Sequence, residues 1–320
     1  HTDYNLGFAL PMAIDLGTVV TITPTEDPWL LLRSDLDPQP AQIPLHGTYE
    51  GPLWGRLAAA VAELVGVASG GIGDVASTLP VGAGLSSSAA FCVALALALG
   101  CEVASHELAR ICQGAEARVG AHVGLMDPLV AIEGTAGHAL LIDFSTLRID
   151  RIRVPSTVEI VAVHSGEHRA LGATPYGERR AECAAAADLI GSPLGTASID
   201  ALTRIDNPRL RSRARHVVTE CARVRQMAEA LGAGDLETAG HLMVESHRSL
   251  AVDFGVTTPT VDALVARLLK FEGVFGARMT GGGFGGCVVA LCRQGALDSE
   301  IWPGRAWHVR PSNGAAIRRL

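Results

Sequence analysis

The chain has 320 residues, of which 48% are hydrophobic and 18% charged, and this composition indicates a well-buried globular protein and argues against disorder. The net charge is −7 and the basic residues are scattered, which disfavours nucleic-acid binding because that needs a concentrated positive surface. The longest apolar run, Ala89 to Leu99, is too short to span a bilayer, so a membrane protein is not expected.

The first part of the chain predicts a mixture of strands and helices. Residues 8–33 contain β-branched runs typical of strands, and residues 34–52, rich in Pro, Asp and Gly, predict a loop or hairpin. The run from Ala89 to Leu99 is apolar on every side, so a helix there is expected to be buried. The other expected segments are a helix at about 54–66, a glycine-rich stretch at 69–74 and a helix at about 105–118.

The second part is richer in helices. Strand-like runs occur between residues 138 and 163, and Pro155 and Ser156 separate the strand-rich half of the chain from the helix-rich half. Pro155 and Ser156 therefore predict a boundary between domains 1–155 and 156–320. Helices are expected at 176–190 and 208–232, from Asp235 onward and after the capping pair Thr258 and Pro259, with strands at about 274–280 and 287–292.

The start of the chain and its cysteines carry further information. Residues 1–5 contain neither an initiator Met nor a secretory pattern, which predicts that the chain begins inside a longer natural sequence. The seven cysteines are far apart and form no CxxC pair, which favours reduced core cysteines in a cytosolic protein. Lys270 is the only lysine, so a phosphate site would have to use backbone amides or arginine.

The loop at 82–88 has the composition of an anion site. Its glycines let backbone N–H groups converge, and its three serines begin the buried helix, whose amino end carries a positive partial charge. The loop is not a Walker loop, because no Gly-Lys-Ser/Thr follows. The alternative is a Gly/Ser-rich turn that only caps a core helix.

A second loop, at 281–286, has five glycines in six positions between two predicted strands. So many glycines indicate that another backbone or a ligand approaches closely. The alternative is a flexible β-turn.

Two carboxylates stand out. Asp127 precedes Pro128, which predicts extended geometry outside a helix interior, and it is either a catalytic group or a turn residue. Glu116 follows Cys112 by four residues, so it borders the apolar stripe of its helix and either faces inward towards a metal or lies at the solvated edge. At the start of the chain, His1, Asp3 and their polar neighbours could bind a polyhydroxylated ligand or could belong to a frayed terminus.

Taken together, these segments resemble the galactokinases, a family of the GHMP kinases. The start His1-Thr2-Asp3-Tyr4-Asn5 resembles the galactokinase signature, residues 84–90 resemble the GHMP phosphate loop and residues 279–287 resemble its third motif. Residues 124–127 and the Tyr176-x-x-Arg179-Arg180 segment appear in the order expected for galactokinases.

The resemblance implies a two-domain α+β fold, with an S5-like amino-terminal half and a ferredoxin-like carboxy-terminal half. It implies ATP and Mg²⁺, with Ser88 and Glu116 as metal ligands, and Asp127 as catalytic base towards the anomeric hydroxyl of galactose. Galactose would contact His1, Asp3, the backbone of Gly124, Asp127 and Tyr176. The phosphates would lie on Gly82, Ala83, Gly84, Leu85, Ser86, Ser87 and Ser88.

The sequence departs from the family in two respects. The family's first strand, an Arg near the transferred phosphate and a Glu adjoining the His would lie before His1, so we expect this chain to be weak or inactive. Pro128 stands where the family has Gln. Three functions stay open: an active monomeric cytoplasmic kinase for galactose, a sensor that binds galactose and ATP without turnover, and a related kinase for N-acetylgalactosamine or another small alcohol.

Overall fold

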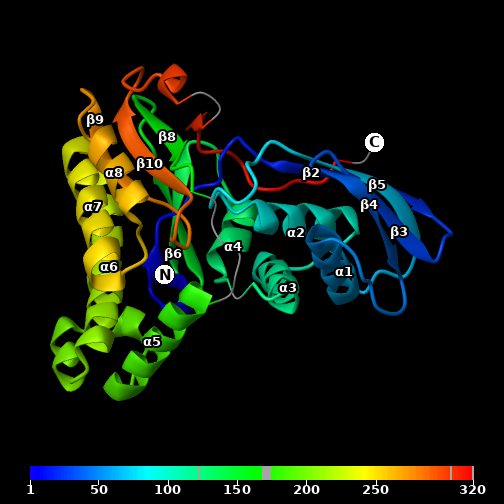
Figure 1. Cartoon of the computed structure of the whole chain (residues 1–320), viewed down its shortest axis with the longest axis horizontal. Coiled ribbons are helices and arrows are strands. Elements are labelled where there is room, and N and C mark those ends of the chain that lie inside the picture. Colours follow the sequence, from blue (N-terminus) through cyan, green and yellow to red (C-terminus); the bar gives the residue numbers. More distant parts are fainter. Residues whose placement is uncertain (122, 168–173, 303–304, 319–320) are drawn as a thin grey trace. The chain divides into compact units, whose positions relative to one another are not determined.

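The computed structural model describes residues 1–121, 123–167, 174–302 and 305–318 (Figure 1). Contacts divide the chain into two compact units, each built from segments far apart in sequence. The first unit contains residues 1–15, 82–85 and 135–312, and the second contains residues 16–81, 86–134 and 313–320. The boundary expected near residue 155 falls inside the first unit, and as a domain boundary it stays a prediction.

The second unit contains a four-stranded sheet in the order β2-β5-β3-β4. Strands β3 and β5 are parallel, whereas the other neighbours are antiparallel. The strands are β2 (Thr18–Thr25), β3 (Trp29–Ser34), β4 (Asp37–Pro44) and β5 (Gly70–Ser77). Of the two structures expected for residues 34–52, the hairpin is therefore the one formed.

Helices of the second unit lie along one face of this sheet (Figure 1). They are α1 (Leu53–Val65), α2 (Ser87–Ala98), α3 (Ser105–Arg118) and α4 (Met126–Glu133). The core joins Leu32 and Ile43 of the sheet to Val61 of α1, Leu95 of α2 and Cys112 of α3. Apolar burial of this kind, worth roughly 25 cal/mol per Å², is what holds the apolar helix α2 in place.

The first unit contains two antiparallel sheets. The larger has the order β11-β8-β10-β9 and the smaller the order β1-β6-β7. The larger sheet is formed by β8 (Val158–His164), β9 (Val274–Met279), β10 (Cys287–Arg293) and β11 (Ala306–Val309). The smaller is formed by β1 (Phe8–Ala9), β6 (His138–Asp143) and β7 (Arg148–Arg153).

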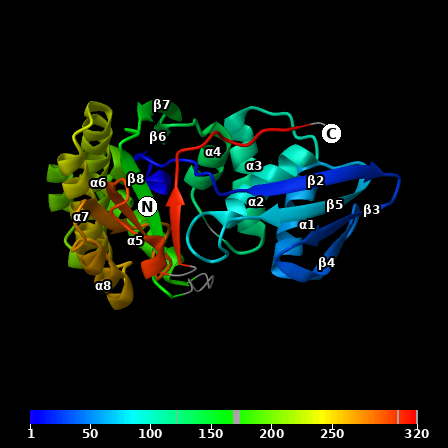
Figure 2. The same ribbon diagram turned by 90° about the horizontal axis from the view of Figure 1, so that it is seen from above.

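Helices α7 and α8 lie beside the larger sheet of the first unit, whereas α6 contacts α7 and the strands of the smaller sheet (Figure 1, Figure 2). The helices are α5 (Thr174–Ile190), α6 (Pro208–Ala233), α7 (Leu236–Ser249) and α8 (Pro259–Leu268). A π-helical turn η4 (Leu250–Phe254) extends α7, and short 3-10 turns lie at Asp3–Asn5, Leu194–Thr196, Ile199–Arg204 and Ser299–Ile301. As predicted, α8 is capped by Thr258, whose hydroxyl oxygen accepts from the backbone N–H of Val261 at 3.2 Å.

Local sequence failed to predict strand β5. Its glycines suggested no strand, yet the neighbouring backbones need them. A Cβ at Gly70 would lie 2.0 Å from the carbonyl oxygen of Asp27, and one at Gly73 would lie 2.5 Å from that of Thr21. The expectation that the cysteines are unpaired core residues is confirmed, because all seven are free and buried.

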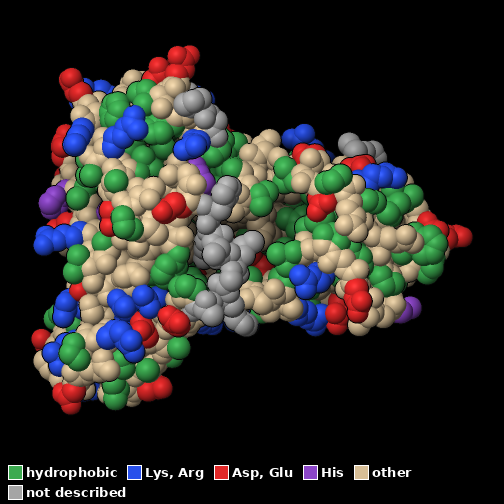
Figure 3. Space-filling view, viewed as in Figure 1, with side chains coloured by type: hydrophobic (Ala, Val, Ile, Leu, Met, Phe, Trp, Pro, Cys, Tyr) green, Lys and Arg blue, Asp and Glu red, His purple; other side chains and the backbone are tan. Residues whose placement is uncertain are grey.

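The surface carries charges of both signs. On the face seen in Figure 3, Lys and Arg side chains are interspersed with Asp and Glu side chains. Among the described residues, no helix combines the length and hydrophobicity needed to cross a membrane.

A buried polar cluster connects α6, α7 and β9 in the first unit. The Nδ1 atom of His216 lies 2.9 Å from the hydroxyl oxygen of Ser249. The carboxylate of Glu220 accepts from Arg223 at 2.8 Å and from Arg278 at 3.1 Å. Burial lowers the pKa of His216 from 6.5 to about 3. Burial alone would raise the pKa of Glu220, but the charges of Arg278, His216 and Arg223 outweigh it and hold that pKa at about 2.

We predict that this cluster makes the protein sensitive to acid. Both pKa values are lowered by folding, so the unfolded chain binds more protons, and stability is lost as the pH falls below 6.5 for His216 and below 4.5 for Glu220. Between pH 6.5 and about pH 5, the wild type should lose about 2 kcal/mol of unfolding free energy through His216. The variant His216→Gln should not show this part of the loss. Denaturant unfolding at several pH values measures this. His106→Gln, at an exposed position of α3, is the control and should leave the wild-type slope unchanged; equal slopes for wild type and His216→Gln would contradict the prediction.

Candidate active site

The backbone angles of the loop at 82–88 are compatible with the anion cradle expected from its sequence. The chain passes from the first unit to the second between Leu85 and Ser86. The φ angles of Gly82, Gly84 and Ser86 are +72°, +78° and +60°, so left-handed residues alternate with others, and this alternation lets amides converge. Ser86 precedes α2, and no side chain among the described residues caps that helix. A left-handed serine costs on the order of 1–3 kcal/mol, and such strain is typical of ligand sites.

The glycine loop at 281–286 is shaped by close approach of other backbones in the first unit. A Cβ at Gly281 would lie 2.9 Å from the carbonyl oxygen of Gly84, and one at Gly286 would lie 3.0 Å from that of Ala83. A Cβ at Gly283 would lie 2.5 Å from the carbonyl oxygen of Val256. The expectation that another backbone approaches this loop is confirmed, and the loop supports residues 83 and 84 of the anion cradle.

Three oxygen-bearing side chains gather in the second unit. The hydroxyl of Ser88, on the first turn of α2, donates to Oε1 of Glu116 on α3 at 2.6 Å. Glu116 is only 2% exposed, so of its two predicted orientations the inward one is formed. Burial raises its pKa from 4.5 to about 7, the negative charge of Asp127 adds to the rise and the Ser88 hydrogen bond opposes it.

The Glu116 carboxylate fits a hard cation. Its Oε2 atom is buried and has no hydrogen-bond partner among the described residues. A buried carboxylate oxygen without a partner is unfavourable unless a proton or a cation neutralises it. No group of three or more His, Cys, Asp or Glu side chains suited to a metal occurs in the described ranges. That finding is compatible with Mg²⁺, which is commonly bound by one or two carboxylates together with substrate phosphates.

Asp127 lies in the first turn of α4, so the predicted extended geometry was wrong, whereas its predicted place outside a helix interior is confirmed. Pro128 is tolerated there because the first turn of a helix does not use its backbone N–H groups. Asp127 is half-buried, and Gly124, just before the helix, is buried. The second unit therefore brings together Ser88, Glu116 and Asp127, as their electrostatic coupling shows.

The first unit brings His1, Asp3 and Tyr176 into one region, of which Tyr4 and Phe254 are also part. The His1 ring lies 5.4 Å from the Tyr176 ring and 4.6 Å from the Phe254 ring, and Tyr4 lies 5.9 Å from Tyr176. Nδ1 of His1 lies 3.0 Å from the Tyr4 hydroxyl, whereas its buried Nε2 has no partner among the described residues. Asp3 begins the short helical turn beside them. Aromatic faces with a few polar atoms are suited to a sugar.

Sequence reasoning missed Phe254. It is an apolar residue at the end of a helical segment, and nothing in its local pattern separates it from an ordinary core residue. Its ring lies 4.6 Å from His1 and 4.6 Å from His216, a contact that only the fold creates.

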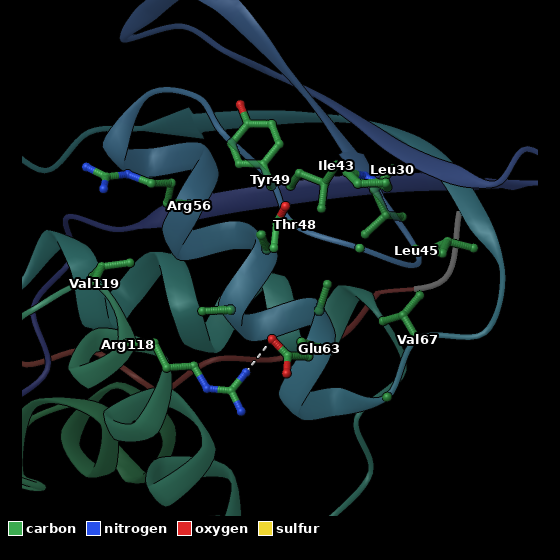
Figure 4. Close-up of a pocket in the computed structure, with 16 residues that line it drawn as sticks. Leu30, Ile43, Leu45, Thr48, Tyr49, Arg56, Glu63, Val67, Arg118 and Val119 are labelled. Atoms are coloured by element: carbon green, nitrogen blue, oxygen red, sulfur yellow. Dashed lines mark ion pairs between the residues drawn. The ribbon is translucent and has the colours of Figure 1, made fainter.

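The second unit also has a groove that shares no residue with the sites described above. It has a volume of about 400 Å³ and is lined by α1, the β3–β4 hairpin and the end of α3. Tyr49 and Arg56 flank it, and Arg118 pairs with Glu63 at 2.5 Å (Figure 4). None of the predicted site residues lines it.

We predict that Glu116→Gln stabilises the metal-free protein while it weakens binding of magnesium-loaded ATP. At pH 8 the substitution removes a buried negative charge, and a pKa rise from 4.5 to about 7 corresponds to about 3 kcal/mol. Thermal unfolding without metal should therefore occur at a higher temperature. Nucleotide titrations with and without Mg²⁺ complete the test. Glu107→Gln, on the exposed first turn of the same helix, is the control. A lower unfolding temperature for Glu116→Gln would contradict the prediction.

We also predict that Gly281→Ala damages the anion cradle beyond its effect on backbone strain. Gly281 has a φ of +75°, and an added Cβ would be 2.9 Å from the carbonyl oxygen of Gly84. Gly295 has a φ of +73° with no atom within 4 Å of such a Cβ, so Gly295→Ala is the matched control. Strain alone costs about 1–2 kcal/mol in both variants. Only Gly281→Ala should weaken ATP binding, by about tenfold or more, because the cradle must shift. Equal ATP affinities of the two variants would refute this role.

Three family models match the chain. The GHMP kinases N terminal domain matches residues 55–135, and the GHMP kinases C terminal model matches residues 227–301. The galactokinase galactose-binding signature matches residues 1–24. The range of the N terminal domain model includes Ser88, Glu116 and Asp127. The range of the galactose-binding signature includes His1 and Asp3.

Full-length relatives agree with these models. The chain is 39% identical to a galactokinase of Roseiflexus sp. (strain RS-1), with 93% of this chain and 81% of the relative aligned. It is 42% identical to a galactokinase of Mycobacterium bovis (strain BCG / Pasteur 1173P2), over 91% and 85% of the two chains.

Solved structures show the same fold. A Lactococcus lactis galactokinase complexed with galactose superposes with a TM-score of 0.91 at 28% identity, over 98% of this chain and 90% of that one. A mevalonate kinase, at 18% identity and a TM-score of 0.66 over 98% of this chain and 95% of that one, supports the fold alone. The expected two-domain α+β GHMP kinase fold is confirmed, and the chain belongs to the galactokinase family of the GHMP kinases.

Proposed function

We propose that this chain transfers the terminal phosphoryl group of ATP to the anomeric hydroxyl of galactose, giving galactose 1-phosphate and ADP. The observation that carries the proposal is the galactose-binding signature over residues 1–24, which contains His1 and Asp3. Identities of 39% and 42% to galactokinases across nearly the whole chain support the same activity.

The amides of residues 82–88 bind the ATP phosphates in this proposal. Positive φ angles at Gly82, Gly84 and Ser86 and the uncapped start of α2 support it, because both favour negative charge at the same loop. The single lysine of the chain, Lys270, lies in the turn after α8 and outside this loop, so the cradle uses backbone groups or arginine in place of a loop lysine.

The oxygens of Ser88 and Glu116 would hold Mg²⁺ together with the phosphates. The partnerless Oε2 of Glu116 supports this assignment. When bound, the cation supplies neutralisation of phosphate charge, which is the main requirement of phosphoryl transfer.

Galactose is bound by His1, Asp3, Tyr176, the backbone of Gly124 and Asp127. The ring cluster of His1 and Tyr176 supports an apolar sugar face there, and the buried Nε2 of His1 is available for a hydroxyl group. Such contacts orient the anomeric hydroxyl, and orientation is a large part of catalysis in a reaction with two bound substrates.

Asp127 accepts the proton of the anomeric hydroxyl as the reaction proceeds. The sugar oxygen forms a bond to the γ-phosphorus, the bond from that phosphorus to the β,γ-bridging oxygen breaks, and ADP leaves. Asp127 is half-buried and its charge acts on Glu116, which supports a proton acceptor close to the proposed metal ligands. Proton acceptance of this kind contributes about 10²–10⁴-fold.

We further propose that the protein acts as a monomer in the cytoplasm, on small molecules and without nucleic acid. Seven buried free cysteines are compatible with a reducing compartment. The expectation that this chain is weak or inactive has no support in the comparisons, and an assay of ADP release measures it directly.

We predict that the protein releases ADP from ATP in the presence of galactose and that Asp127→Asn lowers kcat by about 10² or more, since the proton acceptor is lost. A coupled assay with galactose, N-acetylgalactosamine, mevalonate and homoserine identifies the substrate. A fluorescent ATP analogue should bind Asp127→Asn as tightly as it binds the wild type.

Asp74→Asn, an exposed aspartate on β5, is the control and should keep the wild-type rate. Turnover of N-acetylgalactosamine in preference to galactose would change the substrate assignment. Sugar binding without ADP release by the wild type would identify a sensor. Near-normal turnover by Asp127→Asn would remove Asp127 from the catalytic role.

A further inference from the structure

Two arginines hold the turn that follows α7. The backbone carbonyl oxygen of Asp253 accepts from Nη1 of Arg213 at 2.6 Å. The next two carbonyl oxygens, of Phe254 and Gly255, accept from Nε and Nη2 of Arg179 at 2.8 and 3.0 Å. The last carbonyls of a helical segment lack partners within it and carry partial negative charge, so guanidinium groups are well suited to them.

One carboxylate joins the two arginines. Oε2 of Glu182 accepts from Nη1 of Arg179 at 3.3 Å and from Nε of Arg213 at 2.8 Å. The side chains of Arg179, Glu182 and Arg213 are 15%, 13% and 11% exposed. Because these charges are largely removed from water, loss of one partner leaves the others poorly compensated. We call Arg179, Glu182 and Arg213 the arginine clamp.

The clamp connects the two segments that form the aromatic region. Tyr176 precedes Arg179 by three residues on α5, so both lie within about one turn of that helix. Phe254, whose carbonyl Arg179 binds, is fully buried, and its ring lies 4.6 Å from the His1 ring. Arg179 thus joins the turn that carries Tyr176 to the turn against which His1 packs.

We propose that Arg179 is a positioning residue that sets the spacing between Tyr176 and His1, and thereby the affinity for the sugar, without touching it. This inference rests on the proposed function for its substrate. The contact of Arg179 with the glycine loop is weaker than its hydrogen bonds to the turn. The guanidinium carbon of Arg179 lies 5.9 Å from the centre of the Phe284 ring, near the limit for a cation–π contact. A loss of Arg179 should therefore act on the sugar more than on the nucleotide.

The chain offers a matched control for the charge of the clamp. Nε of Arg209 lies 3.1 Å from Oε1 of the same Glu182, but its side chain is 69% exposed. The hydrogen bonds described for the carbonyls of residues 253–255 come from Arg179 and Arg213. Arg209→Gln therefore removes one ion pair to Glu182 and leaves the turn held.

The test compares Arg179→Gln, Arg179→Lys and Arg209→Gln with the wild type. Arg179→Gln should raise the KM for galactose by about tenfold or more, with kcat and the KM for ATP changed by less than about threefold, because only substrate positioning is lost. Arg179→Lys should give an intermediate KM, since one ammonium group cannot reproduce the planar fork that reaches two carbonyls and a carboxylate. Arg209→Gln should match the wild type.

A second measurement needs no substrate. Amide hydrogen exchange of residues 250–256 should become about tenfold faster in Arg179→Gln and stay unchanged in Arg209→Gln, because the turn opens more readily. The proposal is overturned by a wild-type galactose KM in Arg179→Gln, by equal rises in the two substrates' KM values or by equal effects of the Arg179 and Arg209 variants. If Arg179→Gln does not fold, Arg179→Lys decides by the same criteria. If the wild type does not phosphorylate galactose, the proposed function fails, while the exchange experiment still tests the clamp.

Discussion

The desolvation of one carboxylate is the constraint on which the proposed chemistry depends. Folding of the second unit buries Glu116 and gives one of its oxygens a hydroxyl partner, Ser88, while the other has none among the described residues. Burial, together with the negative charge of Asp127, makes ionisation of Glu116 unfavourable, so its pKa rises to about 7. A cation carrying phosphate groups would relieve this cost, which links folding of the unit to the binding of its ligand.

In the first unit, the main constraint is that irregular backbone must be held in one conformation. Glycines let residues 281–286 approach residues 83 and 84, which belong to the proposed anion cradle, closely. Arginines satisfy the carbonyls of residues 253–255, and a shared carboxylate joins them. Both sets of contacts hold irregular backbone in a fixed geometry, which a site needs if its bound groups are to react in line.

Much of the fold was predictable because local pattern and tertiary packing agree. The buried helix α2, the Thr258 cap of α8 and the two strands around the glycine loop were all expected, α2 from its continuous apolar run and the cap from the Thr258 and Pro259 pair. Strand β5 was not, because its glycines are required by neighbouring backbones and have low strand propensity of their own. Asp127 was expected in extended backbone, yet Pro128 falls in the first turn of α4, where a missing N–H does no harm.

The sequence by itself determined the family, the two glycine loops and the candidate residues, because each is a short pattern that local chemistry constrains. It left open whether Glu116 faced inward and whether the loop at 281–286 met another backbone, and it gave no sign that Phe254 lay against His1. Tertiary structure decided these points. Burial, close backbone approach and ring contacts join residues that are distant in sequence, such as His1 and Phe254 or Gly84 and Gly281, so no local pattern contains them.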